Sequence, residues 1–370
     1  MTDSRAIEFA TQLVDLLDRA STTSTYKYAV LLGMLDCCQA RVERDGSVPS
    51  VLTTRELARR VLEIYWVQAR PFAVTGGVPQ QNSGGQAKII SRIESFRQHG
   101  ATSTFFAERN NPLEFQRLLN DVEWSLIQMP LPRLQLVVGT ESRFIYDIAW
   151  DTSVRKGADG VAAYQKQFLD CDKPSGTFDN RILLRPGVGE NLVRLGPLLR
   201  PLIQRQWSQT VAGFSGLRDG ALDEFLFGID RQALSRVVEP LMAAQEGVCF
   251  YCEKKLGKLR EVDHFIPWSR SPNDGLHNLV LADQDCNGSK SNHLAEVRHL
   301  RKWRERNDPD HPMGRRFDHE SEGLVWLRNP DESVSIARSL YLSVPRSMPL
   351  WRRKSVFVEA DLRAIHEALA

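Results

Sequence analysis

The spacing of apolar residues along the first hundred positions predicts helices. Residues 1–20 (MTDSRAIEFATQLVDLLDRA) place acidic residues among apolar ones at helical spacing, which is typical of an amphipathic helix. Residues 26–42 are apolar on more than one face, so we expect a buried helix there. Thr53 lies three residues before Glu56. This spacing is that of a capping box and predicts that another helix begins here.

Glycine, proline and polar residues then interrupt the helical pattern. Residues 71–86 are rich in all three and are expected to form an exposed loop. Helical spacing resumes in residues 87–100 and 112–129. Residues 142–150 (SRFIYDIAW) are the best strand candidate in this half of the chain.

Two features suggest breaks further along. A polar, glycine-containing stretch at residues 173–179 is a candidate separator between lobes. Residues 190–214 have a helical pattern that contains Pro197 and Pro201. Because proline lacks the backbone N–H that a helix needs, we expect that helix to be interrupted near these two residues.

The composition indicates an ordinary globular protein. The 370 residues suffice for two domains, and 42% hydrophobic and 25% charged residues are typical of soluble proteins. A net charge of +2 does not indicate a nucleic-acid partner, so such a partner would need a local basic patch. The N-terminus lacks the features of a signal peptide, and no stretch is apolar enough for a membrane span. We therefore expect a cytoplasmic protein that does not bind membranes.

The six cysteines are too few for a disulfide scaffold, yet three of them fall between residues 249 and 286. In a chain without an export signal, this clustering favours a metal site. The other three, Cys37, Cys38 and Cys171, have unremarkable surroundings and are expected to be inert.

Cys249 and Cys252 have the C-x-x-C spacing of a zinc knuckle, in which a tight turn directs both thiolates at one ion. Cys286 is the obvious third ligand. Asp283 occupies the place where a second C-x-x-C would supply a cysteine, and His293 is the alternative fourth ligand. The simpler interpretation, that the three cysteines are only buried apolar residues, does not account for the spacing.

Between the cysteines lies a set of polar residues suited to phosphodiester hydrolysis. The Asp263 carboxylate can bind Mg²⁺, and the neighbouring His264 imidazole can take a proton from water near neutral pH. Asn278 opens a second short strand that could pair with a first strand carrying Val262, Phe265 and Ile266. Asn287 lies near the start of a helix, and Lys290 one turn further could face a phosphate. Singly, these last three are ordinary caps or surface charges. Together, in this order, they are hard to dismiss as isolated caps and surface charges.

The segment from 249 to 294 resembles an HNH endonuclease domain of the zinc-containing ββα-metal type. The spacings from Asp263 to Asn278 and to Asn287 also resemble those of the HNH module in RNA-guided CRISPR nucleases. The resemblance is carried by Cys249, Cys252, Asp263, His264, Pro267, Asn278, Leu279, Cys286, Asn287 and Lys290.

This resemblance implies roles for the matching residues. Asp263 and Asn287 would coordinate one catalytic Mg²⁺ or Mn²⁺, and His264 would be the general base. Asn278 would fix the loop around the histidine through backbone hydrogen bonds. The departure from the family pattern is Asp283, where Cys or His is usual, and it leaves the fourth ligand of the structural Zn²⁺ open.

We expect an α+β protein with three parts. Residues 1–235 would form a mainly helical N-terminal domain for sensing, DNA binding or dimerisation. Residues 236–306 would form the nuclease domain, and residues 307–370 a helical C-terminal extension packed on either of the others. The chain as a whole resembles, more weakly, bacterial HNH proteins with a helical N-terminal region, some of which are linked to phage defence.

The expected function is metal-dependent hydrolysis of DNA, with RNA left open as a substrate. Basic runs that follow the motif make Lys290, Arg298 and Arg301 candidate nucleic-acid contacts, although such runs also occur on simple solvated faces. A double-strand break needs two centres, so a homodimer is attractive, and a defence-system protein is a candidate partner. The alternatives are a catalytically silent, zinc-stabilised nucleic-acid-binding protein and a zinc ribbon that mediates protein contacts.

Overall fold

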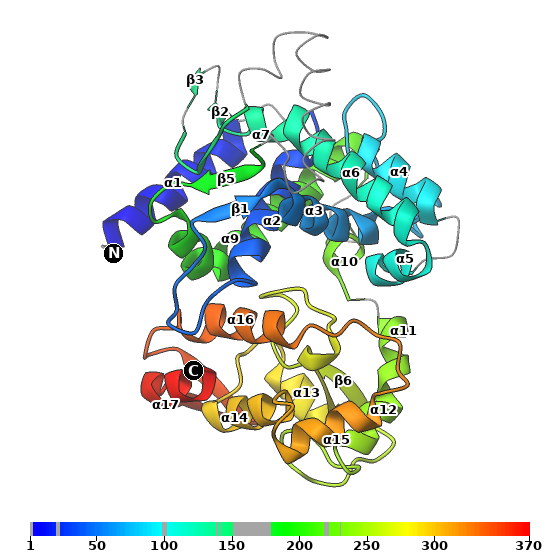
Figure 1. Ribbon diagram of the computed structural model, residues 1–370, viewed down its shortest axis with the longest axis vertical. Coiled ribbons are helices and arrows are strands. Elements are labelled where there is room, and N and C mark those ends of the chain that lie inside the picture. The colour runs from blue at the N-terminus through cyan, green and yellow to red at the C-terminus, as the bar shows by residue number, and fades with distance from the viewer. Residues whose placement is uncertain are drawn as a thin grey trace. The chain divides into compact units, whose positions relative to one another are not determined.

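The computed structural model describes residues 3–19, 23–97, 102–137, 140–141, 143–150, 179–217, 222–229 and 231–370. Cys171 and residues 173–178, for which the sequence suggested an inert thiol and a lobe separator, lie outside the described residues. The chain divides into two compact units (Figure 1). The N-terminal unit contains Met1–Cys38 and Pro49–Gly228, and the C-terminal unit contains Gln39–Val48 and Ile229–Ala370. The boundaries expected after residues 235 and 306 remain predictions.

The N-terminal unit is mainly helical and carries a small antiparallel sheet of strand order β1-β5-β4, together with a β2-β3 hairpin. Helix α3 packs against α4 and α6 (Figure 1). Its helices are α1 (Asp3–Arg19), α2 (Tyr26–Gln39), α3 (Thr54–Gln68), α4 (Lys88–Arg97), α5 (Thr104–Asn110), α6 (Pro112–Gln128), α7 (Pro130–Arg133), α9 (Val188–Ser215) and α10 (Leu222–Phe227). Its strands are β1 (Val51–Thr53), β2 (Leu136–Val137), β3 (Thr140–Glu141), β4 (Tyr146–Ile148) and β5 (Arg181–Leu184).

Most local predictions for this unit are confirmed. Helix α2 is buried on nearly every side, and residues 71–86 contain no helix or extended strand. The capping box is complete, because the Thr53 side chain accepts a hydrogen bond from the backbone N–H of Glu56, whose side chain bonds the backbone of Thr53 in return.

The expected break in α9 is wrong. A single helix runs through Pro197 and Pro201. The two prolines are four residues apart, so they share one side of the helix, and that side is partly exposed. The opposite side buries Leu199, Ile203 and Trp207. This packing offsets the backbone hydrogen bonds that the prolines remove.

The C-terminal unit is built around a two-stranded antiparallel hairpin, β6 (Arg260–His264) and β7 (Leu279–Asp283), followed directly by helix α13 (Gln284–Lys290). Helix α12 packs against β7 and against α15 (Figure 1). The other elements are α11 (Arg231–Leu234), η2 (Ser235–Val237), α12 (Val238–Ala244), η3 (Leu276–Asn278), α14 (Val297–Arg306), α15 (Pro312–Glu320), α16 (Pro330–Tyr341), β8 (Pro349–Arg353), β9 (Val356–Glu359) and α17 (Leu362–Leu369). The α+β class, with helices predominant, is confirmed.

The expected hairpin is present with shifted ends. Phe265 and Ile266 follow β6 instead of belonging to it, although both are fully buried. Asn278 ends the short η3 helix, and β7 begins one residue later. At this end of the hairpin the Asn278 side chain bonds the backbone of Ile266 on both sides, its N–H and its carbonyl.

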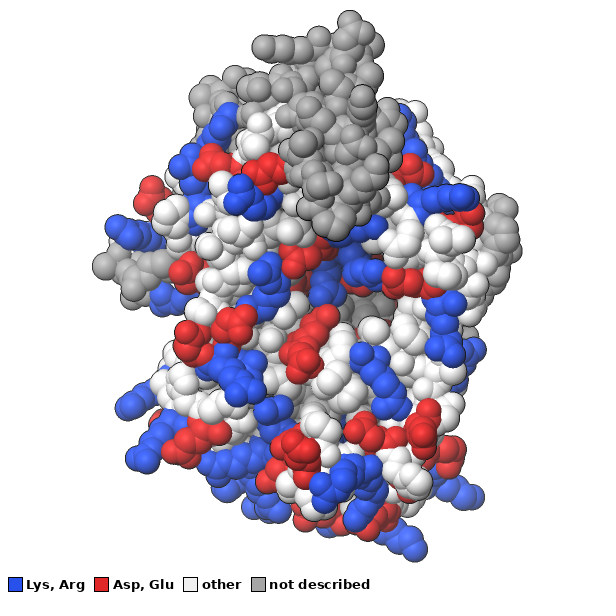
Figure 2. Space-filling model, in the orientation of Figure 1, with Lys and Arg blue, Asp and Glu red and all other residues white. Residues whose placement is uncertain are grey.

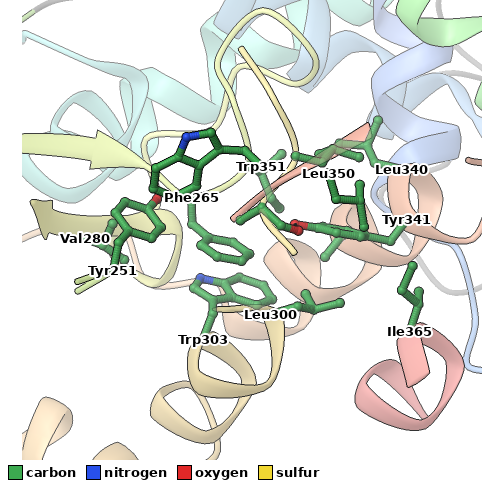
Figure 3. Close-up of a cluster of buried hydrophobic side chains, with 14 of the residues drawn as sticks. Tyr251, Phe265, Val280, Leu300, Trp303, Leu340, Tyr341, Leu350, Trp351 and Ile365 are labelled. Atoms are coloured by element: carbon green, nitrogen blue, oxygen red, sulfur yellow. The ribbon is translucent and has the colours of Figure 1, made fainter. Parts of the chain in front are cut away.

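A large aromatic cluster supports the hairpin (Figure 3). Phe265 stacks on Trp303 of α14, with ring centroids 4.9 Å apart and an interplanar angle of 7°. Tyr341, Trp351 and Ile365, from α16, β8 and α17, complete the same cluster. The core under the hairpin therefore depends on segments far beyond it in the sequence.

A buried arginine fixes the start of β7. The Arg306 guanidinium donates hydrogen bonds to the backbone carbonyls of His277 and Leu279, on either side of Asn278. Burial lowers the pKa of Arg306 to about 9.

In the described part of the chain, no helix is long and apolar enough to cross a membrane.

Candidate functional site

Four side chains gather where the knuckle meets the β6-β7 hairpin. The ligand atoms of Cys249, Cys252, Asp283 and Cys286 all lie within 4.8 Å of one another. The knuckle turn is closed by a 2.8 Å hydrogen bond from the Cys249 N–H to the Lys254 carbonyl. Three thiols and one carboxylate form a donor set that suits a structural zinc ion.

Asp283 has two roles in this cluster. One carboxylate oxygen caps helix α13 by accepting a 2.8 Å hydrogen bond from the Cys286 N–H, and the other accepts a 3.0 Å hydrogen bond from the Cys252 thiol. Burial would raise the pKa of Asp283, but hydrogen bonds from the three surrounding cysteines lower it well below its usual range. A hydrogen bond from Cys286 lowers the pKa of Cys249 to about 6. Burial raises the pKa of the Cys252 thiol to about 11, and the hydrogen bond with Cys249 raises the pKa of Cys286 well above its usual range. Negative charge therefore lies first on Asp283 and Cys249, and a zinc ion would be bound with loss of the protons on the other two thiols.

His293, the alternative fourth ligand, is not a member of this group. Its ring lies edge-on to Phe357, with centroids 4.8 Å apart. The position of Asp283 thus favours it over His293 as the fourth ligand.

Asp263 is almost fully buried and is held at one oxygen. The Tyr251 hydroxyl donates a 2.5 Å hydrogen bond to Oδ2, and the Lys290 ammonium lies 2.9 Å from the same oxygen. Burial, followed by the nearby Asp263 carboxylate, raises the pKa of Tyr251 well above its usual value, so the phenol stays protonated and donates.

Lys290 is placed differently from its expected role. Its side chain is fully buried, and its ammonium also donates a 2.8 Å hydrogen bond to the His264 carbonyl. This position supports a scaffolding role beneath the site, whereas contact with a nucleic-acid phosphate remains a prediction that the burial does not favour.

Asn287 faces the same strand from helix α13. Its side-chain N–H donates a 2.5 Å hydrogen bond to the carboxylate of Glu261. Glu261 and Asp263 lie two residues apart in β6, so their side chains project from the same side of the strand, toward α13. The donor is the amide nitrogen, so the Asn287 amide oxygen remains a candidate metal ligand. Two carboxylates and one amide oxygen suit a hard cation such as Mg²⁺.

His264 ends strand β6 and contacts a residue that the sequence did not single out. Its Nε2 lies 2.7 Å from a carboxylate oxygen of Asp274, in the loop between the strands. The Trp268 ring lies 5.3 Å from the imidazole, centroid to centroid. Among the described residues, no hydrogen bond links His264 to the side chain of Asp263 or of Asn287.

Asn278 ties this loop together. Its side-chain oxygen accepts a 2.8 Å hydrogen bond from the Ile266 N–H, and its amide donates to the carbonyls of Ile266 and Asn273, at 3.2 and 3.0 Å. Its own carbonyl accepts a 2.8 Å hydrogen bond from the Phe265 N–H. Three of these four bonds fix Phe265 and Ile266, the two residues that follow His264, and the fourth ties Asn278 to the loop at Asn273.

Arg298 and Arg301, the other expected nucleic-acid contacts, lie on the exposed side of α14. Arg298 is 3.8 Å from Glu253, and Arg301 is 3.5 Å from Glu367. Exposed pairs of this kind contribute little to stability and exchange readily. Acidic and basic side chains are interspersed over the face drawn in Figure 2, without a single large basic patch.

Residues 249–295 match the family model of the HNH endonuclease, HNH_4. This segment is an HNH domain. No curated protein and no solved structure matches the chain. The HNH match covers the cysteine cluster, the β6-β7 hairpin and α13, so this segment is similar to the domain of nucleases that act on nucleic acids.

Three residues of the site were missed by sequence analysis: Tyr251, Glu261 and Asp274. Glu261 carried a detectable signal, because it lies two positions before Asp263 and therefore on the same side of an expected strand. Tyr251 and Asp274 carried none, since a hydrogen-bond partner across a turn or a loop leaves no periodic pattern.

Proposed function

We propose that this protein is a metal-dependent endonuclease that hydrolyses phosphodiester bonds of DNA. One observation carries the proposal. Within the HNH segment, His264 ends the strand that also presents Asp263, and the Asp274 carboxylate holds its imidazole. An imidazole oriented by a carboxylate is the arrangement expected of a general base.

The hydrogen bond to Asp274 decides which nitrogen of His264 is basic. An ionised carboxylate only accepts hydrogen bonds, so with Asp274 ionised Nε2 of His264 would carry the proton that is donated to it. Nδ1 is then the unprotonated nitrogen, and it would take a proton from the attacking water. Asp274 would also stabilise the imidazolium that results.

Asp263 and Asn287, with Glu261 beside them, would hold the catalytic Mg²⁺ or Mn²⁺. When bound, this ion supplies positive charge for the phosphate and for the leaving oxygen. Asn278 would keep His264 in place through its bonds to the following loop. Cys249, Cys252, Cys286 and Asp283 would hold a structural Zn²⁺, which ties the knuckle to the end of β7 and the start of α13.

The proposed function is tested with the purified protein and supercoiled plasmid DNA. We expect nicked or linear product with Mg²⁺ or Mn²⁺ and none when EDTA replaces the divalent ion. A parallel reaction with single-stranded and duplex RNA identifies the substrate class. If neither nucleic acid is cleaved in the presence of either ion, the proposed function is wrong.

Asp274→Asn should lower the cleavage rate without removing it. The amide keeps the shape of the side chain but loses the charge that stabilises the imidazolium. We expect a loss on the order of 10- to 100-fold, below the full contribution of a general base. Single-turnover cleavage rates measure the effect. Asp318→Asn is the matched control, because Asp318 is similarly exposed and pairs only with Arg328. Equal rates for the two variants would remove Asp274 from the mechanism.

Burial of the centre favours one alternative function. Asp263 and His264 are 8% and 4% exposed, so a nucleic-acid strand has limited access to them. A zinc-stabilised nucleic-acid-binding protein without catalysis would have this property, and it would bind DNA in the plasmid experiment without cutting it. The homodimer, the defence-system partner, the antiviral role and the cytoplasmic location remain predictions from the sequence.

A further inference from the structure

Tyr251 connects the two parts of the HNH domain. It lies between the first two cysteines of the cluster, in the sequence Cys249-Phe-Tyr-Cys252. Its side chain extends away from the knuckle, and its hydroxyl donates a 2.5 Å hydrogen bond to Oδ2 of Asp263. The residue that the knuckle carries thus contacts the carboxylate assigned to the catalytic ion.

We propose that Tyr251 is a positioning residue that aligns Asp263 for the catalytic divalent cation. The zinc knuckle then does more than stabilise the fold, since it sets the orientation of a ligand in the second metal site. The inference rests on the proposed function for the assignment of Asp263.

The Tyr251 ring is held firmly enough for this role. It packs edge-on against His299 and Trp351, with centroid distances of 5.3 and 5.1 Å and interplanar angles of 88° and 83°. Figure 3 shows the side chain within the aromatic cluster, close to Val280. A ring clamped on several sides cannot turn its hydroxyl away from Asp263 without disturbing the core.

The backbone of the knuckle is fixed as well. The Phe250 N–H donates a 3.0 Å hydrogen bond to the Leu281 carbonyl of β7, and the Glu253 N–H donates a 3.0 Å hydrogen bond to the Cys249 carbonyl. The knuckle is therefore bonded to the same hairpin that carries Asp263. Movement of the knuckle upon loss of zinc would move the Tyr251 hydroxyl with it.

Both contacts on Asp263 are made by the same carboxylate oxygen. Tyr251 and Lys290 both engage Oδ2, and among the described residues no hydrogen bond or ion pair reaches Oδ1. Oδ1 is then the oxygen left to coordinate a cation. Lys290 balances the charge of the carboxylate and is shared with the His264 carbonyl, whereas the hydroxyl of Tyr251 donates to Asp263 alone. Partners behind a metal ligand of this kind typically change metal affinity or activity on the order of 10- to 100-fold when removed.

The test compares Tyr251→Phe with Tyr341→Phe. Tyr341 lies in the same cluster and is fully buried, and its hydroxyl donates a 2.9 Å hydrogen bond to the Ala295 carbonyl instead of to Asp263. Both variants lose one buried hydroxyl. The measurements are zinc content, thermal denaturation, the Mg²⁺ concentration for half-maximal plasmid cleavage, and Mn²⁺ affinity by electron paramagnetic resonance.

We expect Tyr251→Phe to keep its zinc and its fold, and to need on the order of tenfold more Mg²⁺ and Mn²⁺ than the wild-type protein. Tyr341→Phe should have a melting temperature similar to that of Tyr251→Phe, and its Mg²⁺ and Mn²⁺ dependences should equal those of the wild-type protein. Equal ion dependences in the two variants would overturn the inference while the nuclease assignment stood. If the wild-type protein binds Mn²⁺ and Tyr251→Phe binds it more weakly, but the wild-type protein cleaves no nucleic acid, the role of Tyr251 stands and the nuclease assignment is wrong. Wild-type protein that binds no Mn²⁺ would overturn the role of Tyr251.

Discussion

His264→Ala is expected to reduce DNA cleavage on the order of 10²- to 10⁴-fold, which is the usual contribution of a general base. The variant should still fold, because the loop after His264 is held by Asn278 and by the packing of Phe265 on Trp303. It should also retain zinc, since none of the four clustered ligands contacts the imidazole. The readouts are single-turnover cleavage of plasmid DNA and binding of a labelled duplex by fluorescence anisotropy.

The matched control for this prediction is His366→Ala. His366 lies on α17 and is exposed, so its loss should change neither cleavage nor binding. The general-base assignment fails if His264→Ala retains a rate near that of the wild-type protein. It also fails if the variant loses DNA binding in step with cleavage, since a base acts on the reaction and not on affinity.

Cys249→Ser is expected to release zinc and to unfold the HNH hairpin. Structural zinc in small modules contributes apparent binding free energies of about 10–16 kcal/mol. The aromatic cluster of this unit holds the surrounding helices together, so we expect the loss of zinc to unfold the hairpin and to lower the melting temperature of the unit by a large amount. Metal analysis and calorimetry measure the two effects.

Cys37→Ala is the control for a buried thiol outside the cluster. Cys37 lies in α2, and its replacement should cost a little packing energy and leave the zinc content unchanged. Native zinc content and native melting temperature in Cys249→Ser would show that the cysteine cluster is not a structural metal site.

The sequence predicted those parts of the site that obey spacing rules. The C-x-x-C pair, the Asp263-His264 dipeptide and the two asparagines lie at fixed separations, because a two-strand hairpin followed by a helix fixes them. The prolines of α9 show the limit of such reasoning. Local chemistry predicts a break, and the tertiary packing of Leu199 and Ile203 overrides it.

Side-chain partners across turns were beyond the reach of the sequence. Asp274 is ten residues from His264, in an irregular loop whose path depends on Asn278 and Arg306. The direction of Lys290 was also not predictable, because a short helix can turn the same residue toward solvent or toward the strand beneath it. Its final position follows from how α13 packs on β6.

The aromatic stack of Phe265 on Trp303 has a consequence for protein engineering. The HNH match ends at residue 295, whereas the residues that cover this stack continue to Leu369. A fragment that ends with the motif would expose Phe265 and its apolar neighbours to solvent, and we expect such a fragment to aggregate. The HNH motif therefore does not carry its own core, and a graft onto another host protein must include the chain through α17.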